Sequence, residues 1–164
     1  MSDESIMKCN PRIFEECEKW DKRFLELARH VSTWSKDPST KCGAVCIGKS
    51  GQVLTTGYNG FPRGCDDSEE LYLDREYKYK NIVHAEMNAI FNASLNGVSL
   101  NGSTLFVSGM PPCHACSSGI AQSGISRVVY HCDKSVLPES WQSSCDLGYK
   151  ILRSANVVYR YHHL

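Results

Sequence analysis

Four residues of the types that bind metal or transfer protons occur in two short segments. His84 is followed two residues later by Glu86, and Cys113 is followed three residues later by Cys116. One imidazole and two thiolates are a zinc donor set, and three protein ligands leave the fourth position of a tetrahedral zinc for water. A carboxylate so close to the histidine can move protons to and from that water. The four residues therefore predict zinc-dependent hydrolysis, with Glu86 as the acid–base.

Both segments have the features of helix starts. Cys113 and Cys116 are three residues apart, so a helix that begins there places both sulfurs on one face of its first turn. Free backbone N–H groups at this end favour the thiolate, which is the form that binds metal. We expect His84 and Glu86 to open a second helix. If the two helix starts are adjacent, the three ligands converge on one ion, and Glu86 is the nearby base.

The cysteine pair has other interpretations when it is taken alone. A C-x-x-C segment is also typical of a redox pair or of half a structural zinc site. The histidine and glutamate upstream, with Pro112 directly before Cys113, complete the pattern H-x-E…P-C-x-x-C. That pattern is typical of zinc-dependent nucleobase deaminases and favours a catalytic zinc.

The chain has nine cysteines, an odd number, and its first ten residues lack the basic and apolar regions of an export signal. Reduced thiols in the cytoplasm are therefore expected rather than a disulfide framework. We expect buried free thiols, and a second, structural zinc that uses some of them with His131, His162 or His163 stays open. The cysteines outside the pair are Cys9, Cys17, Cys42, Cys46, Cys65, Cys132 and Cys145.

Hydrophobic periodicity predicts the elements that position these residues. A stripe at spacings of three and four indicates a long helix from Pro11 that ends before Pro38 and faces the core or a subunit interface. The stripe consists of Phe14, Cys17, Trp20, Phe24, Leu27, Val31 and Trp34. Further helices are predicted at 83–95, 113–123 and 141–154, and strands at 43–47, 52–58, 104–108, 127–130 and 156–161. Residues 66–81 are expected to form an exposed loop with a helical turn or two.

This order, α-β-β-α-β-α-β-α-β, predicts one domain over residues 1–164. The expected fold is of the α/β class, a three-layer α-β-α sandwich with a mixed sheet of about five strands. The chain has 18 basic and 18 acidic residues, and this zero formal charge disfavours a long polynucleotide as substrate and weakly favours self-association. No apolar run approaches the ~20 residues of a membrane span, so no membrane partner is expected.

Several stretches resemble the deoxycytidylate (dCMP) deaminases of the cytidine deaminase-like superfamily. They are SKDPSTKCGAV (35–45), GYNGFPRG (57–64), HAEMNAI (84–90), PCHAC (112–116) and, more weakly, GISRVVY (124–130). The histidine and cysteine segments identify the superfamily, whereas SKDP and GYNG are similar to the dCMP branch. The resemblance implies a cytidine deaminase-like fold and zinc-dependent conversion of dCMP to dUMP, the precursor of thymidylate. It also implies that His84, Cys113 and Cys116 bind Zn²⁺.

The resemblance extends to the substrate and to effectors. It implies that Glu86 is the proton shuttle and that Asn59 contacts the deoxyribose, with Ser35 and Lys36 on the phosphate side. Members of the family are often homohexamers that dCTP with Mg²⁺ activates and dTTP inhibits. The expected effector site is the loop after GYNG, with Phe61, Arg63 and Gly64. The chain departs from the family at Cys42, where valine is usual, which is expected to affect packing below the active site.

Two alternatives remain. A related deaminase that acts on tRNA adenosine or on cytosine in a polynucleotide would need a basic groove and contacts to flanking nucleotides. A zinc module that binds nucleotides or partners without turnover would most simply lack the glutamate, which is present here as Glu86.

Overall fold

The computed structural model describes residues 11–132 and 137–162, with side chains from residue 17 onwards. Its centre is a five-stranded sheet in the order β2-β1-β3-β4-β5. β1 runs antiparallel to both β2 and β3, whereas β3, β4 and β5 are mutually parallel. The strands are β1 (Gly43–Ile47), β2 (Val53–Tyr58), β3 (Thr104–Ser108), β4 (Arg127–His131) and β5 (Val158–Tyr161).

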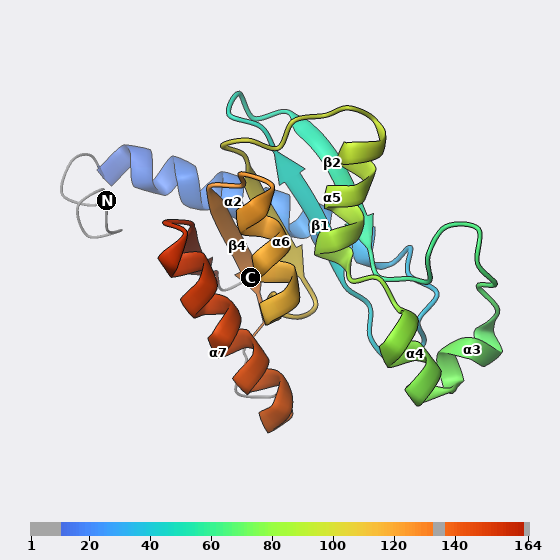
Figure 1. Cartoon of the computed structure of the whole chain (residues 1–164). Coiled ribbons are helices and arrows are strands. Elements are labelled where there is room, and N and C mark those ends of the chain that lie inside the picture. The colour runs from blue at the N-terminus through green and yellow to red at the C-terminus, as the bar shows by residue number, and fades with distance from the viewer. Residues whose placement is uncertain (1–10, 133–136, 163–164) are drawn as a thin grey trace.

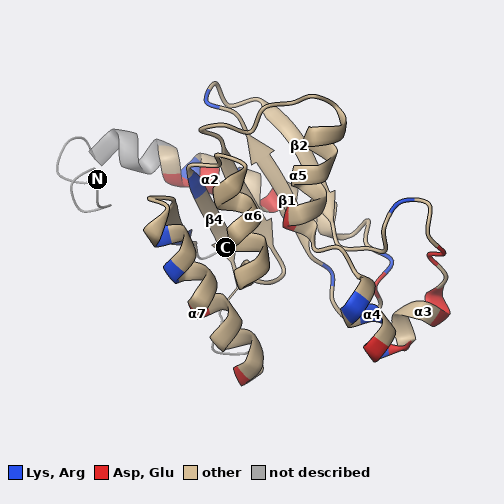
Figure 2. Cartoon of the chain, in the orientation of Figure 1, with Lys and Arg blue, Asp and Glu red and all other residues tan. Residues whose placement is uncertain are grey.

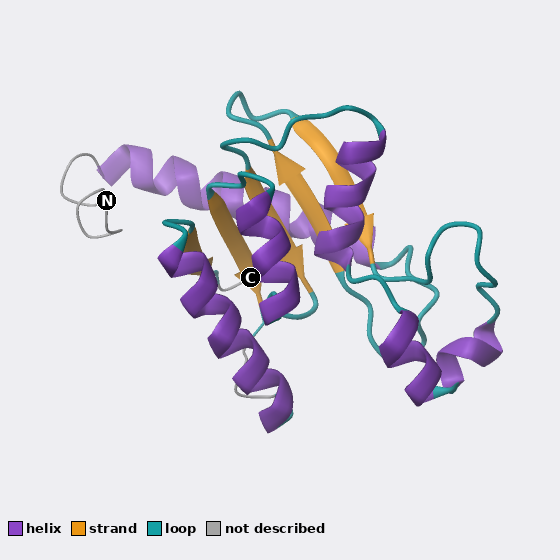
Figure 3. Ribbon diagram, viewed as in Figure 1, coloured by secondary structure: helices purple, strands orange, loops and turns teal. Residues whose placement is uncertain are grey.

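Helices cover both faces of this sheet (Figure 1). One face carries α2 (Pro11–Ser32), and the other carries α5 (Ala85–Leu95), α6 (His114–Gln122) and α7 (Glu139–Ser154). Figure 3 shows two short helices, α3 (Glu69–Leu73) and α4 (Arg75–Asn81), which lie outside the three layers, beyond the N-terminal end of α5. The predicted three-layer sandwich with a mixed five-stranded sheet is confirmed. None of the described helices is long and apolar enough to cross a membrane.

The two faces of the three central strands, β1, β3 and β4, belong to different hydrophobic clusters. Ala44 and Cys46 of β1 pack with the cluster beneath α5 and α6, whereas Val45 and Ile47 pack with the cluster beneath α2. This alternation follows from the two-residue period of a strand. Because β1 and β3 are buried between the two helical layers, they hold the site elements on a rigid base.

The long N-terminal helix buries part of the predicted stripe, since Phe24 and Leu27 pack against the cluster that contains Val31. Val31 is buried as expected, but Trp20 and Trp34 each remain 50% exposed and Cys17 is exposed. The helix touches the sheet at Ala28, whose carbonyl oxygen lies where Gly43 of β1 has no side chain. The face around Ala28 is therefore the one that packs against the sheet, while Trp34 lies beyond the end of the helix at Ser32. The side chain of Phe14 lies outside the described residues.

Residues 66–81 are more ordered and more buried than the sequence indicated. They form α3 and α4, in which Tyr72 and Lys78 are buried. The side chain of Asp74 caps α4 by accepting a hydrogen bond from the backbone N–H of Tyr77, at 3.0 Å. The segment is mostly exposed, as expected, but it is more helical than expected, and the side chains of Tyr72 and Lys78 face the interior.

A close approach between β2 and α5 sets the position of the first site helix. A Cβ atom on Gly57 would lie 2.3 Å from the backbone oxygen of Ala85 and from the backbone nitrogen of Ala89. Only glycine permits this contact. The helix starts at Ala85, two residues later than predicted, because Val83 instead pairs with Gly60 in an isolated β-bridge.

Candidate metal centre and active site

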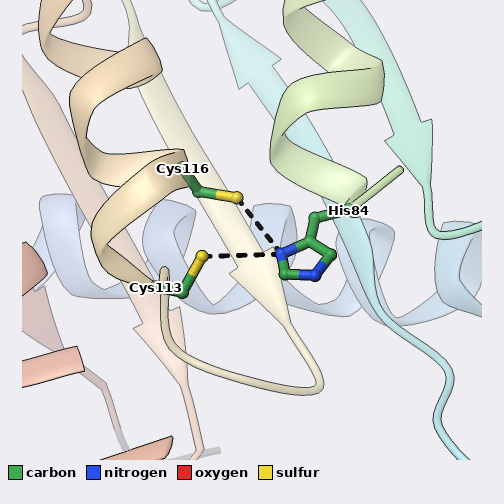
Figure 4. A group of neighbouring side chains, drawn as sticks. All are labelled: His84, Cys113 and Cys116. Carbon is green, nitrogen blue, oxygen red and sulfur yellow. Dashed lines mark hydrogen bonds between the residues drawn. The ribbon is translucent and has the colours of Figure 1, made fainter. Parts of the chain in front are cut away.

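His84, Cys113 and Cys116 converge between the starts of α5 and α6 (Figure 4). His84 is the residue before the first turn of α5, and Cys113 occupies the same position in α6. The Nδ1 atom of His84 lies 3.6 Å from Sγ of Cys113 and 3.3 Å from Sγ of Cys116. All three donor atoms lie within 4.8 Å of one another. The two helix starts are therefore adjacent, as the convergence of the three ligands requires.

This donor set fits zinc. Bonds of about 2.3 Å to sulfur and about 2.0–2.1 Å to nitrogen place the two atoms about 3.6 Å apart around a tetrahedral ion. The observed separations between sulfur and Nδ1 are close to that value. The set also contains the ligand types that zinc prefers and leaves a fourth position open. Among the described residues no other group of histidine, cysteine and acidic side chains has such an arrangement.

The electrostatics of the cysteine pair also suit a metal. A hydrogen bond with Cys116 lowers the pKa of the Cys113 thiol to about 3. The hydrogen bond with His84 also lowers this pKa, whereas burial raises it. The neighbouring Cys113 and burial raise the pKa of Cys116. These effects favour the thiolate form of Cys113, which is the form that binds metal, and the hydrogen bond with Cys113 raises the pKa of His84.

Glu86 places a carboxyl group beside these ligands. It lies in the first turn of α5 and is only 4% exposed. Burial raises the pKa of this carboxyl, while His84 and a hydrogen bond with Cys116 oppose the effect. A buried carboxyl with a raised pKa next to a metal site has the properties of a general acid–base.

A cavity of about 230 Å³ opens on this group. Its apolar wall includes Trp141, whose ring centre lies 5.9 Å from that of His84. Its polar residues include Glu86 and, away from the metal ligands in sequence, Asn59 and Lys78. The described lining residues are Asp37, Thr40, Cys42, Asn59, Lys78, Tyr79, Ile82, His84, Ala85, Glu86, Met110, Pro111, Cys113, Leu137, Pro138 and Trp141. The cavity can hold a small organic molecule with one end against the metal ligands.

Comparison with known proteins agrees with this geometry. Residues 18–132 match the family model described as the cytidine and deoxycytidylate deaminase zinc-binding region. The chain belongs to this deaminase family. An uncharacterised deaminase of Aliivibrio fischeri, encoded in the luxG 3′ region, is 44% identical over 110 residues, which are 67% of this chain and 71% of that protein.

Two further relatives carry a more specific name. Mouse deoxycytidylate deaminase is 35% identical over 137 residues, covering 79% of this chain and 73% of the mouse protein. The crystal structure of a dCMP deaminase from cyanophage S-TIM5, in complex with dCMP and dUMP, superposes with a TM-score of 0.69 at 26% identity. That match covers 88% of this chain and 97% of the phage chain. The chain is thus an enzyme of the deaminase class.

The three residues predicted to contact substrate occupy different places in the deaminase. Asn59 lines the cavity, and its side chain accepts from the backbone N–H of Cys42 and donates to the carbonyl oxygen of Thr40. Ser35 is buried, and its hydroxyl donates to the carbonyl oxygen of Asn59 at 2.8 Å. Lys36 does not line this cavity; its exposed ammonium pairs with Asp67 at 2.7 Å.

Lys36 instead lines a second cavity of the deaminase, together with the predicted effector residues Phe61, Arg63 and Gly64. Two pairs of adjacent residues, Lys36 with Asp37 and Asn59 with Gly60, form a wall that the two cavities share. Lys36 and Gly60 line the second cavity, whereas Asp37 and Asn59 line the first. The guanidinium of Arg63 donates to the side-chain oxygen of Asn92 at 2.9 Å.

The lining residues that sequence reasoning missed include Asp37, Lys78 and Trp141. Asp37 lies in the SKDP stretch, so the resemblance could have drawn attention to it. Lys78 had no usable signal, because its segment shows no clear period. Trp141 was assigned only to an amphipathic helix. Their roles depend on where α4 and α7 pack, which local spacing does not determine.

The remaining cysteines are only partly as expected. Cys46 and Cys145 are buried free thiols, whereas Cys17 and Cys65 are exposed, so the expectation of burial is wrong for the latter two. Cys42 and Cys132 are intermediate. Cys9 and His163 lie outside the described residues. Cys42 lines the first cavity, so the departure expected at this position falls on the wall of the candidate site.

Proposed function

We propose that this deaminase hydrolyses dCMP to dUMP and ammonia and so supplies the precursor of thymidylate. The observation that carries the proposal is the convergence of a zinc-type donor set and a buried carboxyl on one cavity. Similarity to deoxycytidylate deaminases, including a phage enzyme crystallised with dCMP and dUMP, supports the choice of substrate.

The assigned residues divide the chemistry between them. His84, Cys113 and Cys116 would hold the zinc, which when bound acidifies water and stabilises developing negative charge. The carboxylate of Glu86 accepts a proton from the attacking water and delivers it to the ring nitrogen N3. The water oxygen bonds to C4, and the bond from C4 to the amino nitrogen then breaks. Glu86 also takes the second proton from the hydroxyl group now on C4 and delivers it to the departing nitrogen, which leaves as ammonia while the C4 carbonyl forms.

The cavity walls suit a pyrimidine nucleotide. The apolar side chains of Ile82, Met110 and Trp141 can pack against a flat base. Asn59, whose side chain fixes the segment before β1, is the candidate for contact with the deoxyribose, as the family resemblance implies. The hydroxyl group of Ser35 donates to the carbonyl oxygen of Asn59, so we propose that Ser35 positions Asn59 and does not itself touch the substrate.

An ammonia-release assay across a panel of substrates tests the proposal. Purified holoenzyme should release ammonia fastest from dCMP, more slowly from deoxycytidine and dCTP, and not from adenine nucleotides. A preference for adenosine in a tRNA stem-loop, or for cytosine in single-stranded DNA, would instead support the polynucleotide alternative. Tight nucleotide binding without release of ammonia would support the non-catalytic module.

We further propose that the second cavity binds dCTP with Mg²⁺ as activator and dTTP as inhibitor. Arg63 offers a guanidinium to a triphosphate, and Phe61 offers a ring to a base. The shared wall gives a short route from this cavity to Asn59 in the first. Arg63→Glu should abolish both effects while basal activity persists, and Arg153→Glu, an exposed change on α7, should leave regulation intact. Unchanged regulation in the Arg63 variant would place the effector site elsewhere.

We also propose that the enzyme is a cytoplasmic homohexamer. The edge strand β2 and the overlying α5 expose Val53, Phe91 and Leu95, each at least half accessible in the single chain. Burial of such side chains between copies is favourable. Light scattering should give a mass six times that of the 18.4 kDa chain, and a monomer would contradict the proposal.

A further inference from the structure

The start of α7 forms one wall of the first cavity. Leu137, Pro138 and Trp141 line the cavity on that side, and none of them is charged. Figure 2 shows that the neighbouring α6 carries no charged residue, whereas basic and acidic residues lie together on α4. The wall at the start of α7 therefore suits an uncharged, apolar part of a ligand.

Trp141 is held in place within this wall. The centre of its ring lies 5.9 Å from that of His84. Its backbone N–H donates to the carbonyl oxygen of Pro138 at 2.9 Å. The carbonyl oxygen of Leu137 accepts from the side-chain amide of Gln142 at 2.7 Å, and α7 packs along α6. These contacts leave the indole little freedom to move away from a ligand.

The opposite wall comes from the segments next to β1 and β2. Cys42 precedes β1 and Asn59 follows β2, and both line the cavity. Burial and the nearby carboxyl of Glu86 both raise the pKa of the Cys42 thiol, so Glu86 also lies toward this wall. In Figure 1, α6 lies between α5, which covers β1 and β2, and α7. The two walls therefore flank the metal ligands from opposite sides.

The proposed reaction determines how a pyrimidine lies between these walls. C4 must face the metal ligands, and N3 must face Glu86. With the deoxyribose at Asn59, the edge of the base from N3 to N1 runs along the wall that Cys42 and Asn59 form. N3 and C5 flank C4 on opposite sides of the ring. The edge from C5 to C6 therefore faces the wall at the start of α7.

We propose that Trp141 lies against C5 of the pyrimidine and limits the size of the group at C5, so that the enzyme prefers dCMP to 5-methyl-dCMP. This deepens the proposed function and rests on it. The cavity of about 230 Å³ is smaller than the range of about 300–1,000 Å³ that is usual for ligand sites. A methyl group at C5 would therefore meet the indole, and a wall that does not repack makes such a group costly.

Two variants that enlarge the cavity on different sides test the role of Trp141. Trp141→Ala should raise the ratio of kcat/KM for 5-methyl-dCMP to that for dCMP at least about tenfold, since one such group in an apolar pocket changes this ratio about 10–200-fold. Ile82→Ala enlarges the cavity next to α4 and should leave the ratio within about twofold of the original. Trp20→Ala, at a half-exposed position of α2, should change neither the ratio nor the activity.

An unchanged ratio in Trp141→Ala would overturn the proposal. An equal rise in Ile82→Ala would overturn it as well, because the total volume of the cavity would then decide the preference. If Trp141→Ala unfolds or loses its metal, Trp141→Leu keeps an apolar side chain of intermediate size and is measured instead. Its ratio should rise in the same direction by a smaller factor, and an unchanged ratio counts against the proposal here too.

Calorimetry with the zinc-loaded enzyme distinguishes this proposal from the proposed function. The two ligands are dUMP and dTMP, which differ only by the methyl group at C5 and have no amino group to lose. The unaltered enzyme should bind dUMP at least about tenfold more tightly than dTMP, and Trp141→Ala should reduce that difference. Trp34→Ala, which alters the second cavity, should leave the difference unchanged.

A difference that Trp141→Ala alone reduces would support the role of Trp141 even if dCMP is not turned over, and the proposed reaction would then fail by itself. Equal affinity for dUMP and dTMP in the unaltered enzyme would overturn the role of Trp141. A difference that persists in Trp141→Ala, or that disappears in Trp34→Ala, would overturn it too.

Discussion

Glu86 is a carboxyl group placed within one helical turn of a proposed metal ligand and almost wholly removed from water. Burial raises its pKa, which brings the protonated and ionised forms closer in energy. A group that must accept a proton and then release it works best in that state. The position of Glu86 follows from its spacing to His84, because both residues belong to one helix start.

Glu86→Gln tests the role of this carboxyl. The amide keeps the shape of the side chain but cannot shuttle a proton, so kcat should fall by about 10²–10⁴-fold or more. Zinc content, measured by mass spectrometry, should be unchanged because His84, Cys113 and Cys116 remain. Glu76→Gln, at an exposed position of α4, is the matched control and should be fully active. A Glu86→Gln enzyme with ordinary turnover would remove Glu86 from the mechanism.

Because of Asp37, the stability of the folded enzyme should depend on pH in the acidic range. Burial alone raises the pKa of this carboxyl, but hydrogen bonds from Ser39, Thr40 and Lys78 outweigh it and hold the pKa below its ordinary value. The stability that the ionised group contributes is therefore fully present above the unfolded pKa of about 3.9. It is lost as the pH falls through the lower, folded pKa.

Urea unfolding between pH 7 and pH 2.5 measures this contribution. The original enzyme should lose stability below about pH 4, while Asp37→Asn should be less stable at pH 7, by about 3–5 kcal/mol, because it leaves Lys78 buried without a counter-charge. The difference between the two proteins should shrink as the pH falls. A difference that stays constant down to pH 2.5 would show that Asp37 is not ionised in the folded enzyme.

At the scale of elements, the site depends on how closely α5 approaches the sheet. Gly57 of β2 permits backbone contact with Ala85 and Ala89, and this contact fixes the helix start that carries His84 and Glu86. A similar contact occurs on the other side of the site. A Cβ on Gly148 of α7 would lie 2.5 Å from the hydroxyl oxygen of Ser117 in α6.

Gly57→Ala should displace α5 from β2. Overpacking of this kind costs typically 1–3 kcal/mol, and here the added methyl group meets backbone atoms that cannot rotate away. We expect a lower melting temperature and a reduced zinc content, both measured on the purified protein. Gly60→Ala is the control, because its nearest neighbour would be the hydroxyl of Tyr72 at 3.6 Å. Equal behaviour of the two variants would mean that α5 is not held by this contact.

The predictability of the molecule varies with the range of the interactions. The strands and the three helices on the site face follow from local periodicity, and their ends shift by a few residues where a tertiary pairing such as Gly60 with Val83 intervenes. The convergence of His84 with Cys113 could be inferred because both belong to short patterns. The cavity position of Lys78 and the exposure of Trp20 could not, because both depend on how separate helices pack.

At the scale of the whole molecule, the proposed zinc would join two helices that are separated by a strand in the chain. His84 and the cysteine pair reach the site from α5 and α6, which also pack against each other over the sheet. Metal binding to the folded state stabilises it in proportion to the logarithm of the zinc concentration over Kd. The same ion would thus serve both the reaction and the packing of this face.

Metal analysis and a dCMP deamination assay on one purified sample test the site as a unit. We expect about one zinc per chain, formation of dUMP that stops when a chelator removes the metal, and recovery when zinc is returned. Chelation should also lower the melting temperature. A sample that contains a full complement of zinc yet leaves dCMP unchanged, or that deaminates dCMP after the metal is gone, would contradict the assignment of these residues to this reaction.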